Sequence, residues 1–313
     1  MLKFVYALVS SENDYYAEQA LISMHSLRLH NPDACIVLVT DSATLNTLTG
    51  NRAQIKDYVN EYVTVNPPAE FTPVQKSRFI KTSLRQNVKG DFLYIDNDTI
   101  IVDSLDALEE LDCEMGAVLD LHTTADNNVQ LNWYLKHTKK EFWGYNRYFN
   151  GGVLFVRDTE NTHKLFADWH RLWNEERVKY GINKDQPTFA QANVANGCLI
   201  KELDDYYNCQ IFMPYGKRYA LTARIIHYFY NTRDINSDIY DILRRIKKEG
   251  FNDELKCIVS NPYFILSDSL FPDAAERKIY ELPMAVLGRK LARDYAWTNK
   301  VAKFIYRLFG FKI

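Results

Sequence analysis

The chain has 313 residues, of which 47% are hydrophobic and 25% are charged, and its formal net charge is -2. This composition supports one large core, and the charge balance argues against nucleic acid as the main partner, because such proteins carry a strongly basic surface. The five cysteines lie far apart without a C-x-x-C pair, so they indicate neither a disulfide framework nor a zinc site, and they fit a reducing cytosol.

The first 65 residues alternate between strand and helix patterns. Apolar runs predict strands at 4–9, 35–39 and 62–65, and apolar residues at helical spacing predict a helix that ends at Asn31-Pro32 and another near 43–58. This β-α-β-α-β series predicts an α/β fold with a doubly wound parallel sheet. The first strand is not followed by the glycine-rich loop of dinucleotide-binding or P-loop proteins.

The loop after the first strand carries Asp14, Tyr15 and Tyr16. An aromatic ring and a carboxylate at this point could hold a nucleotide base by stacking and hydrogen bonding. An Asx cap with a packing tyrosine is an equal alternative.

A predicted helix at 74–87 carries four cations: Lys76, Arg78, Lys81 and Arg85. A solvated helix face is the ordinary explanation of such a pattern. The alternative is that one of them, Arg78, points into a cleft toward phosphate.

The stretch that follows carries the strongest chemical signal. Phe92–Ile95 reads as a strand that is buried on both faces, and Asp96-Asn97-Asp98 comes directly after it. Open α/β sheets bind ligands at the carboxyl ends of their strands, and paired carboxylates suit Mg²⁺ or Mn²⁺. We therefore predict a metal–diphosphate site here.

Further along, Ser104 could cap a short helix through Leu111. A strand at 116–119 then ends in Asp120. The aromatic segment 121–147 lacks periodicity, so it is interpreted as an irregular loop on the acceptor side. In the strand 148–156, Asn150 and two glycines mark either a bulge or a close approach of a ligand.

The third quarter of the chain predicts a helix at 163–180 and strands at 198–203, 207–212 and 224–229. Asp185-Gln186-Pro187 opens another helix, which Asp185 could simply cap. His227 lies alone on an apolar strand, and by itself it is better explained as a packed residue than as a ligand.

The C-terminal part has a different character. A charged helix is predicted at 236–248 and a loop at 260–272. The tail 289–313 carries seven basic residues and one acid, a net charge of 7 − 1 = +6. Five apolar residues share one helical face of this tail: Trp297, Val301, Phe304, Ile305 and Leu308. This pattern indicates an in-plane membrane helix on anionic lipid, with a helix docked on its own domain as the alternative.

Several features of the chain follow one another in the order and rough spacing of a known family. They are Asn-Asp-Tyr-Tyr, an arginine-bearing helix, Leu-Tyr-Ile-Asp-Asn-Asp, Tyr-Phe-Asn-Gly-Gly-Val, Asp-Gln-Pro and Ile-His-Tyr. In this order the chain resembles the retaining nucleotide-sugar glycosyltransferases of family 8. This family includes bacterial galactosyl- and glucosyltransferases and glycogenin. The resemblance covers about residues 3–230. It implies a GT-A fold, a Rossmann-like, mostly parallel sheet flanked by helices, in a domain at 1–231, with a helical C-terminal extension at 232–313.

The resemblance also implies roles for individual residues. The implied ligands of Mn²⁺ or Mg²⁺ are Asp96, Asp98 and His227, which replaces the packing interpretation of that histidine. The implied donor-binding residues are Asp14, Tyr15 or Tyr16 at the uracil, Arg78, Asn97, and Asn150 at the family's F-N-[AG]-G. The implied sugar-side and catalytic residues are Asp120, Asp185 and Gln186. The family's Gly-Pro-x-Lys-Pro-Trp is absent after His227, so the lysine that reaches the diphosphate is missing or is supplied elsewhere.

The implied function is metal-dependent transfer of a hexose from a UDP-sugar to a glycan or glycolipid acceptor with retention of configuration. We expect a role in cell-surface polysaccharide or lipopolysaccharide assembly, on the inner face of the cell membrane. One alternative is a haloacid-dehalogenase-like phosphatase, whose D-x-D opens its domain, whereas here more than 90 residues precede Asp96 and Thr99 follows Asp98 directly. Another alternative is a non-catalytic, membrane-associated carbohydrate-binding scaffold.

Overall fold

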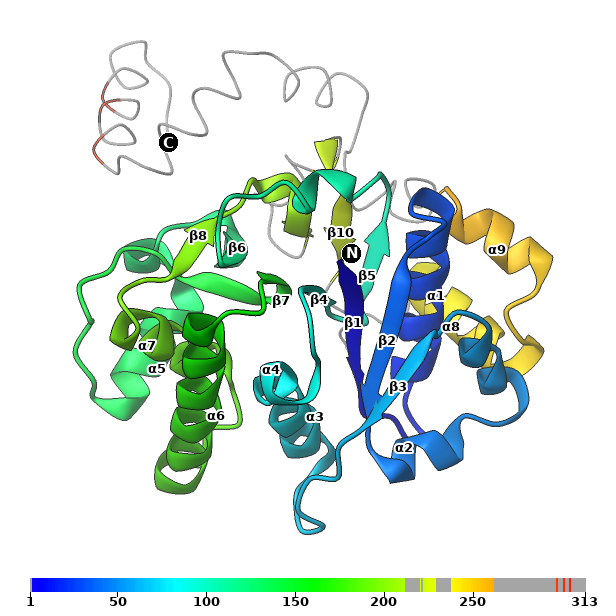
Figure 1. Ribbon diagram of the computed structural model, residues 1–313, viewed down its shortest axis with the longest axis horizontal. Helices are drawn as coiled ribbons and strands as arrows, with labels where there is room; N and C mark the ends of the chain where they lie inside the picture. Colours follow the sequence, from blue (N-terminus) through cyan, green and yellow to red (C-terminus); the bar gives the residue numbers. More distant parts are fainter. Residues whose placement is uncertain are drawn as a thin grey trace.

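The computed structural model describes residues 2–211, 220, 222–228, 238–261, 297, 301 and 304. The main sheet has seven strands in the order β3-β2-β1-β4-β7-β6-β8 (Figure 1). Their bounds are Lys3–Leu8 (β1), Cys35–Thr40 (β2), Glu61–Thr64 (β3), Phe92–Ile95 (β4), Met115–Leu119 (β6), Phe149–Val156 (β7) and Ile200–Glu202 (β8). Only β7 runs antiparallel to its neighbours β4 and β6. The α/β class and the mostly parallel sheet are confirmed.

Both faces of this sheet are covered, which explains why its strands read as continuous apolar runs. In β1, Phe4, Tyr6 and Leu8 belong to one hydrophobic cluster and Val5 and Ala7 to another. The first cluster includes helices α1 (Tyr16–His30), α8 (Asp238–Glu249) and α9 (Asp253–Val259). The second includes α3 (Pro73–Thr82), α4 (Leu84–Asn87), α6 (Glu160–Tyr180) and α7 (Gln186–Ala195) (Figure 1).

A second, three-stranded sheet joins distant parts of the chain. Its strands are β5 (Thr99–Ile101), β10 (Ile225–His227) and β9 (Cys209–Gln210), in the order β5-β10-β9. The antiparallel pairing of β10 with β5 sets His227 opposite Thr99. This register brings His227 to the end of the Asp96-Asn97-Asp98 turn.

Four elements differ from the sequence-based expectation. The helix expected near 43–58 is a short α2 (Ser42–Thr47) followed by a 3-10 helix, Gly50–Asp57, whose first residue, Gly50, has a left-handed φ of 55°. The helix expected at 74–87 is interrupted at Ser83. The expected short helix after Ser104 is reduced to a 3-10 turn, Asp106–Leu108, and the strand expected at 207–212 begins with the 3-10 helix Asp205–Asn208.

The segment 121–147 is not irregular throughout, because it contains α5 (Val129–Thr138). Asn128 caps this helix by accepting hydrogen bonds from the backbone N–H groups of Gln130 and Leu131. Only Leu131, Tyr134 and Thr138 are buried on it. Such a narrow buried face gives a weak periodic signal, which explains why the helix was missed.

The described part of the C-terminal region packs on the N-terminal half. Asn51 donates to the Lys247 carbonyl (3.1 Å), and the Phe251 N–H donates to Gln54 Oε1 (2.7 Å). The helix predicted at 236–248 is confirmed as α8, whereas α9 was not predicted. The predicted loop at 260–272 lies outside the described residues except at its first two positions, as does the tail apart from residues 297, 301 and 304. None of the helices in the described part of the chain has the length and hydropathy to cross a membrane.

Candidate active site

The three predicted metal ligands lie together at the carboxyl end of β4. Asp96 leaves the strand with its N–H bonded to the Gly152 carbonyl at 2.7 Å, so the turn is fixed against β7. His227 Nε2 lies 3.2 Å from Asp98 Oδ1, although 129 positions separate the two residues. One ligand atom from each of the three side chains lies within 4.8 Å of the other two.

The hydrogen bonds of His227 determine which nitrogen could bind a cation. Its Nδ1 lies 3.0 Å from Asn208 Oδ1, and the Asn208 amide nitrogen donates to Asn150 Oδ1 at 2.9 Å. Asn208 Oδ1 is therefore an acceptor, so Nδ1 carries the proton and Nε2 faces the carboxylates. Burial lowers the pKa of His227, but the nearby Asp98 and Asp96 outweigh burial, and the pKa is raised.

This donor set fits a hard or borderline divalent cation. Two carboxylates and a neutral imidazole nitrogen are ligands of Mn²⁺ and Mg²⁺ sites, and the second nitrogen of a metal-bound histidine is usually held by a hydrogen bond, as Asn208 does here. Neighbouring ligand atoms around such an ion lie about 3–4 Å apart, and the His227 Nε2 to Asp98 Oδ1 distance of 3.2 Å falls in this range.

Lys81 was not predicted as a site residue, yet it lies at the centre of the site. Its side chain is only 5% exposed, and its Nζ lies 3.1 Å from Asp96 Oδ1 and 4.0 Å from Asp185 Oδ2. It also lies over the Tyr94 ring, 5.0 Å from the centroid. Burial raises the pKa of Asp96, but Lys81 and His227 outweigh burial, so the pKa is lowered. The signal in the sequence was the three-residue spacing from Arg78, which puts both cations on one face of α3.

Arg78 and Asp185 form the ion pair next to this lysine. The Arg78 Nε lies 3.0 Å from Asp185 Oδ1, and the Asp185 side chain is 9% exposed. Asp185 occupies the cap position of α7, but its side chain makes no capping hydrogen bond with the described backbone. The capping alternative for Asp185 is therefore wrong. Arg78 remains 35% exposed, but its guanidinium is paired with a carboxylate. Gln186, the next residue, accepts a hydrogen bond from the Gly151 N–H at 3.2 Å.

A buried amide network holds Asp120 beside β7. Asn150 donates to Asp120 Oδ1 and Asn128 donates to Asp120 Oδ2, both at 2.9 Å. Asn150 Oδ1 in turn accepts from the Gly152 N–H (2.8 Å) and from Asn208 (2.9 Å). Since Asn208 also holds His227, the network connects the predicted sugar-side carboxylate with the predicted metal ligands. Sequence reasoning missed Asn128 and Asn208, which have no motif of their own.

Gly152 explains the double glycine of β7. A Cβ atom at this position would lie 2.5 Å from His227 Cε1 and 2.8 Å from Asp96 Oδ2. A Cβ at Gly151 would meet only Lys81 atoms, at an ordinary 3.6 Å. The groups that approach Gly152 are therefore the protein's own side chains and not a ligand. The bulge alternative is confirmed, because the register of β6 with β7 shifts between the pairs Leu119–Phe149 and Ala117–Leu154.

The predicted residues in the loop after β1 have different roles in the structure. The Asp14 carboxylate accepts from Ser10 Oγ (2.6 Å), the Ser11 N–H (2.7 Å) and the Tyr16 N–H (3.2 Å), so it shapes the loop. Tyr15 packs edge-on against Tyr240 of α8.

Of Tyr15 and Tyr16, Tyr16 is the exposed residue, with 43% of its surface accessible to solvent. Burial is the main cause of its raised pKa, followed by Asp14, while Arg78 lowers the pKa and Asp98 raises it further. Tyr16 is therefore close enough to Arg78 and Asp98 for their charges to change the pKa of its hydroxyl. A buried ion pair, Arg52 Nε to Glu18 Oε1 at 2.6 Å, secures the loop.

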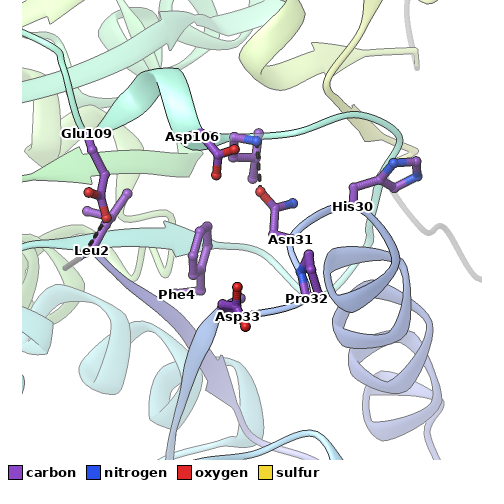
Figure 2. A pocket seen from close by; sticks show the side chains of 10 residues that line it. Leu2, Phe4, His30, Asn31, Pro32, Asp33, Asp106 and Glu109 are labelled. Carbon is purple, nitrogen blue, oxygen red and sulfur yellow. Dashed lines mark hydrogen bonds between the residues drawn. The ribbon is translucent and has the colours of Figure 1, made fainter.

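A separate cavity of about 550 Å³ lies at the opposite edge of the sheet, beside the amino ends of β1 and β2 (Figure 2). Its acidic and apolar walls include Leu2, Phe4, Asp33, Asp106 and Glu109. Glu109 is engaged by the Leu2 N–H at 2.8 Å. None of the predicted site residues lines this cavity.

Comparison with known proteins agrees with this geometry. Residues 7–233 match the family model described as glycosyl transferase family 8. Sequence comparison with curated proteins gives no match.

Among solved structures, the chain is similar to the galactosyltransferase LgtC in complex with donor and acceptor sugar analogs. The TM-score is 0.53 and the identity 16%, over 82% of this chain and 99% of that chain. It is similar to an active-site glutamine-to-glutamate variant of LgtC, with a TM-score of 0.51 and 17% identity over 81% and 98% of the two chains. It is also similar to the bifunctional glycosyltransferase WbbM, with a TM-score of 0.55 and 15% identity over 81% of this chain and 51% of that chain.

These findings do not fit the phosphatase or the non-catalytic scaffold. The chain is a glycosyltransferase with the GT-A fold, and it belongs to glycosyl transferase family 8.

Proposed function

We propose that this enzyme transfers a hexose from a UDP-sugar to a glycan or glycolipid acceptor in a metal-dependent reaction that retains the anomeric configuration. The observation that carries the proposal is the convergence of Asp96, Asp98 and His227, whose ligand atoms lie within 4.8 Å of one another at the carboxyl end of a central strand. A divalent cation bound there supplies Lewis-acid stabilisation of the diphosphate leaving group.

Tyr16 and Asn97 are the proposed contacts of the nucleoside. The exposed ring of Tyr16 offers a stacking surface for uracil. Asn97 donates to the Ala7 carbonyl (3.0 Å), while its buried Oδ1 has no hydrogen-bond partner among the described residues. A ribose hydroxyl would satisfy this oxygen. In this proposal Asp14 and Tyr15 act indirectly, by holding the loop that presents Tyr16.

On the sugar side, the proposed residues are Asp120, Asp185 and Gln186, with Arg78 and Asn150 as their partners. Departure of the diphosphate leaves positive charge at the anomeric carbon, which nearby oxygen atoms stabilise. Asp185 is oriented by Arg78, and Asp120 by two amides, so both carboxylates are held in position before the sugar binds. The Gln186 side chain is anchored to the Gly151 N–H and contributes a neutral amide. The LgtC variant that changes an active-site glutamine supports a role for such a residue.

We further propose that residues 1–231 form the catalytic domain, that 232–313 form an extension, and that the extension attaches to the inner face of the cell membrane. Trp297, Val301 and Phe304 are helical and are 62%, 44% and 63% exposed, and their spacing sets them on one face. The tail around them has a net charge of +6 by sequence. An apolar face bordered by cations is typical of helices that lie on anionic lipid. Such attachment suits an acceptor in a surface polysaccharide or lipopolysaccharide.

The test is a screen of sugar nucleotides with Mn²⁺ that measures released UDP. We expect at least one UDP-sugar to be hydrolysed, and Asp98→Asn to abolish this activity because it removes a carboxylate ligand. Asp241→Asn, on α8 and with a side chain that is 53% exposed, is the control for a lost surface charge. Full hydrolysis by Asp98→Asn, or hydrolysis that is equally fast in EDTA, would contradict the proposal.

A further inference from the structure

The exposed face of α5 carries large apolar side chains that the fold does not use. Val129 and Trp133 are 61% and 48% exposed, and they follow one another at helical spacing. His137 continues the same face and stacks on Trp133, with ring centroids 5.1 Å apart and planes at 13°. An exposed tryptophan beside an exposed aliphatic side chain is a common feature of binding surfaces.

This face is continuous with the sugar side of the candidate active site. Asn128, which caps α5, also donates to the Asp120 carboxylate, so the first turn of the helix is fixed to a proposed sugar-binding residue. On the other side, Lys184 directly precedes Asp185, and its Nζ lies 4.9 Å from the centroid of the Trp133 ring. We call Val129, Trp133 and Lys184 the platform. Two of its residues are chain neighbours of the sugar side, since Val129 follows Asn128, which holds Asp120, and Lys184 precedes Asp185.

Its chemistry matches a saccharide. A pyranose has an apolar C–H face that packs on the negative face of an indole ring, and a rim of hydroxyl groups that needs hydrogen-bond partners. Lys184 now lies over the Trp133 ring, so it must turn aside when a pyranose packs there, and it can then donate to the hydroxyl rim. Its contact with Gln130 Oε1 is long, at 3.4 Å, and does not hold it in place. Gln130, on the same helix, supplies an amide with both a donor and an acceptor.

The position of the platform indicates that it binds the acceptor rather than the donor. The donor nucleotide is assigned to the β1 loop and the turn after β4, and the donor hexose to the buried carboxylates. An acceptor hydroxyl that reaches the anomeric carbon between Asp120 and Asp185 leaves the rest of its glycan to extend past Lys184. We propose that Val129, Trp133 and Lys184 form a subsite that binds a pyranose unit of the glycan acceptor, an inference that rests on the proposed function.

The first test measures transfer to sugar against transfer to water. A panel of free disaccharides (maltose, lactose, cellobiose and gentiobiose) is offered with Mn²⁺ and the hydrolysed UDP-sugar. In Trp133→Ala we expect the ratio of saccharide transfer to hydrolysis to fall about tenfold, which corresponds to about 1.4 kcal/mol, because the stacking surface for the pyranose is lost. Trp133→Phe should recover part of the ratio, and Lys184→Ala should raise the acceptor KM. Leu29→Ala, 47% exposed on α1, is the control and should match the wild type. An unchanged ratio in Trp133→Ala would overturn the proposal.

The second test is independent of catalysis. Oxidation of Trp133 by N-bromosuccinimide, located by mass spectrometry, is measured with each disaccharide in the absence of nucleotide. We expect at least one disaccharide to slow oxidation of Trp133 and not of Trp297, which is 62% exposed. Equal oxidation of Trp133 with every disaccharide would overturn the subsite. If a disaccharide protects Trp133 but no UDP-sugar is hydrolysed, the subsite is supported and the proposed donor is contradicted.

Discussion

Replacing Gly152 by alanine should disrupt the metal site while leaving the rest of the fold intact. The added Cβ would lie 2.5 Å from His227 Cε1, whereas real Cβ contacts are not shorter than 3.0 Å, so the imidazole must move by at least 3.0 − 2.5 = 0.5 Å. Overpacking of this kind costs about 1–3 kcal/mol of unfolding free energy. Metal–ligand distances tolerate only about ±0.2 Å, so the displaced histidine should no longer bind the cation.

Gly151→Ala is the matched control, because the two glycines are adjacent in β7 and the new Cβ at 151 would meet only Lys81, at 3.6 Å. Thermal unfolding is followed with and without Mn²⁺ and UDP. We expect Gly152→Ala to unfold at a lower temperature and to lose the stabilisation by Mn²⁺ and UDP. Gly151→Ala should keep both, since alanine restricts the unfolded chain more than glycine does. Normal stabilisation in Gly152→Ala, or equal loss in Gly151→Ala, would refute the steric argument.

Three further predictions concern other parts of the chain. Lys81→Met removes the cation 3.1 Å from Asp96, so Mn²⁺ alone should raise the unfolding temperature more in this variant than in the wild type or in Lys81→Arg; an equal rise would show that the ammonium does not compete with the metal. Burial, with a further contribution from Lys256, lowers the pKa of His25 from 6.5 to about 4, so the unfolded chain binds a proton that the folded chain lacks between these values. The unfolding free energy of the wild type should therefore fall more steeply between pH 6.5 and pH 4 than that of His25→Gln in urea titrations, and parallel curves would contradict this. Removal of residues 289–313 should weaken sedimentation with anionic liposomes, at about 1 kcal/mol per basic residue near the surface, whereas unchanged sedimentation would favour a helix docked on its own domain.

The sequence was most informative where one short motif carries the chemistry. Asp96 and Asp98 follow a buried strand, and the end of a central strand in an open α/β sheet is where a ligand site is expected. The parallel series of the first 65 residues likewise predicted the sheet, because its apolar runs have both faces covered. His227 shows the limit of local patterns, since by itself it read as a packed residue. Only the pairing of β10 with β5 brings it to Asp98.

The residues that were missed depend on long-range contacts. Lys81 looked like one of four solvated cations, but it is buried between Asp96 and Asp185. Asn128 and Asn208 belong to no motif, and they matter through the groups that they hold in place.

The most direct test of the account is the dependence of UDP binding on the cation. In thermal unfolding, we predict that UDP raises the midpoint only when Mn²⁺ is present, that EDTA abolishes the shift, and that Asp98→Asn lacks it while remaining folded. A UDP-induced shift of equal size in EDTA would contradict the central claim that Asp96, Asp98 and His227 bind the donor diphosphate through a metal ion.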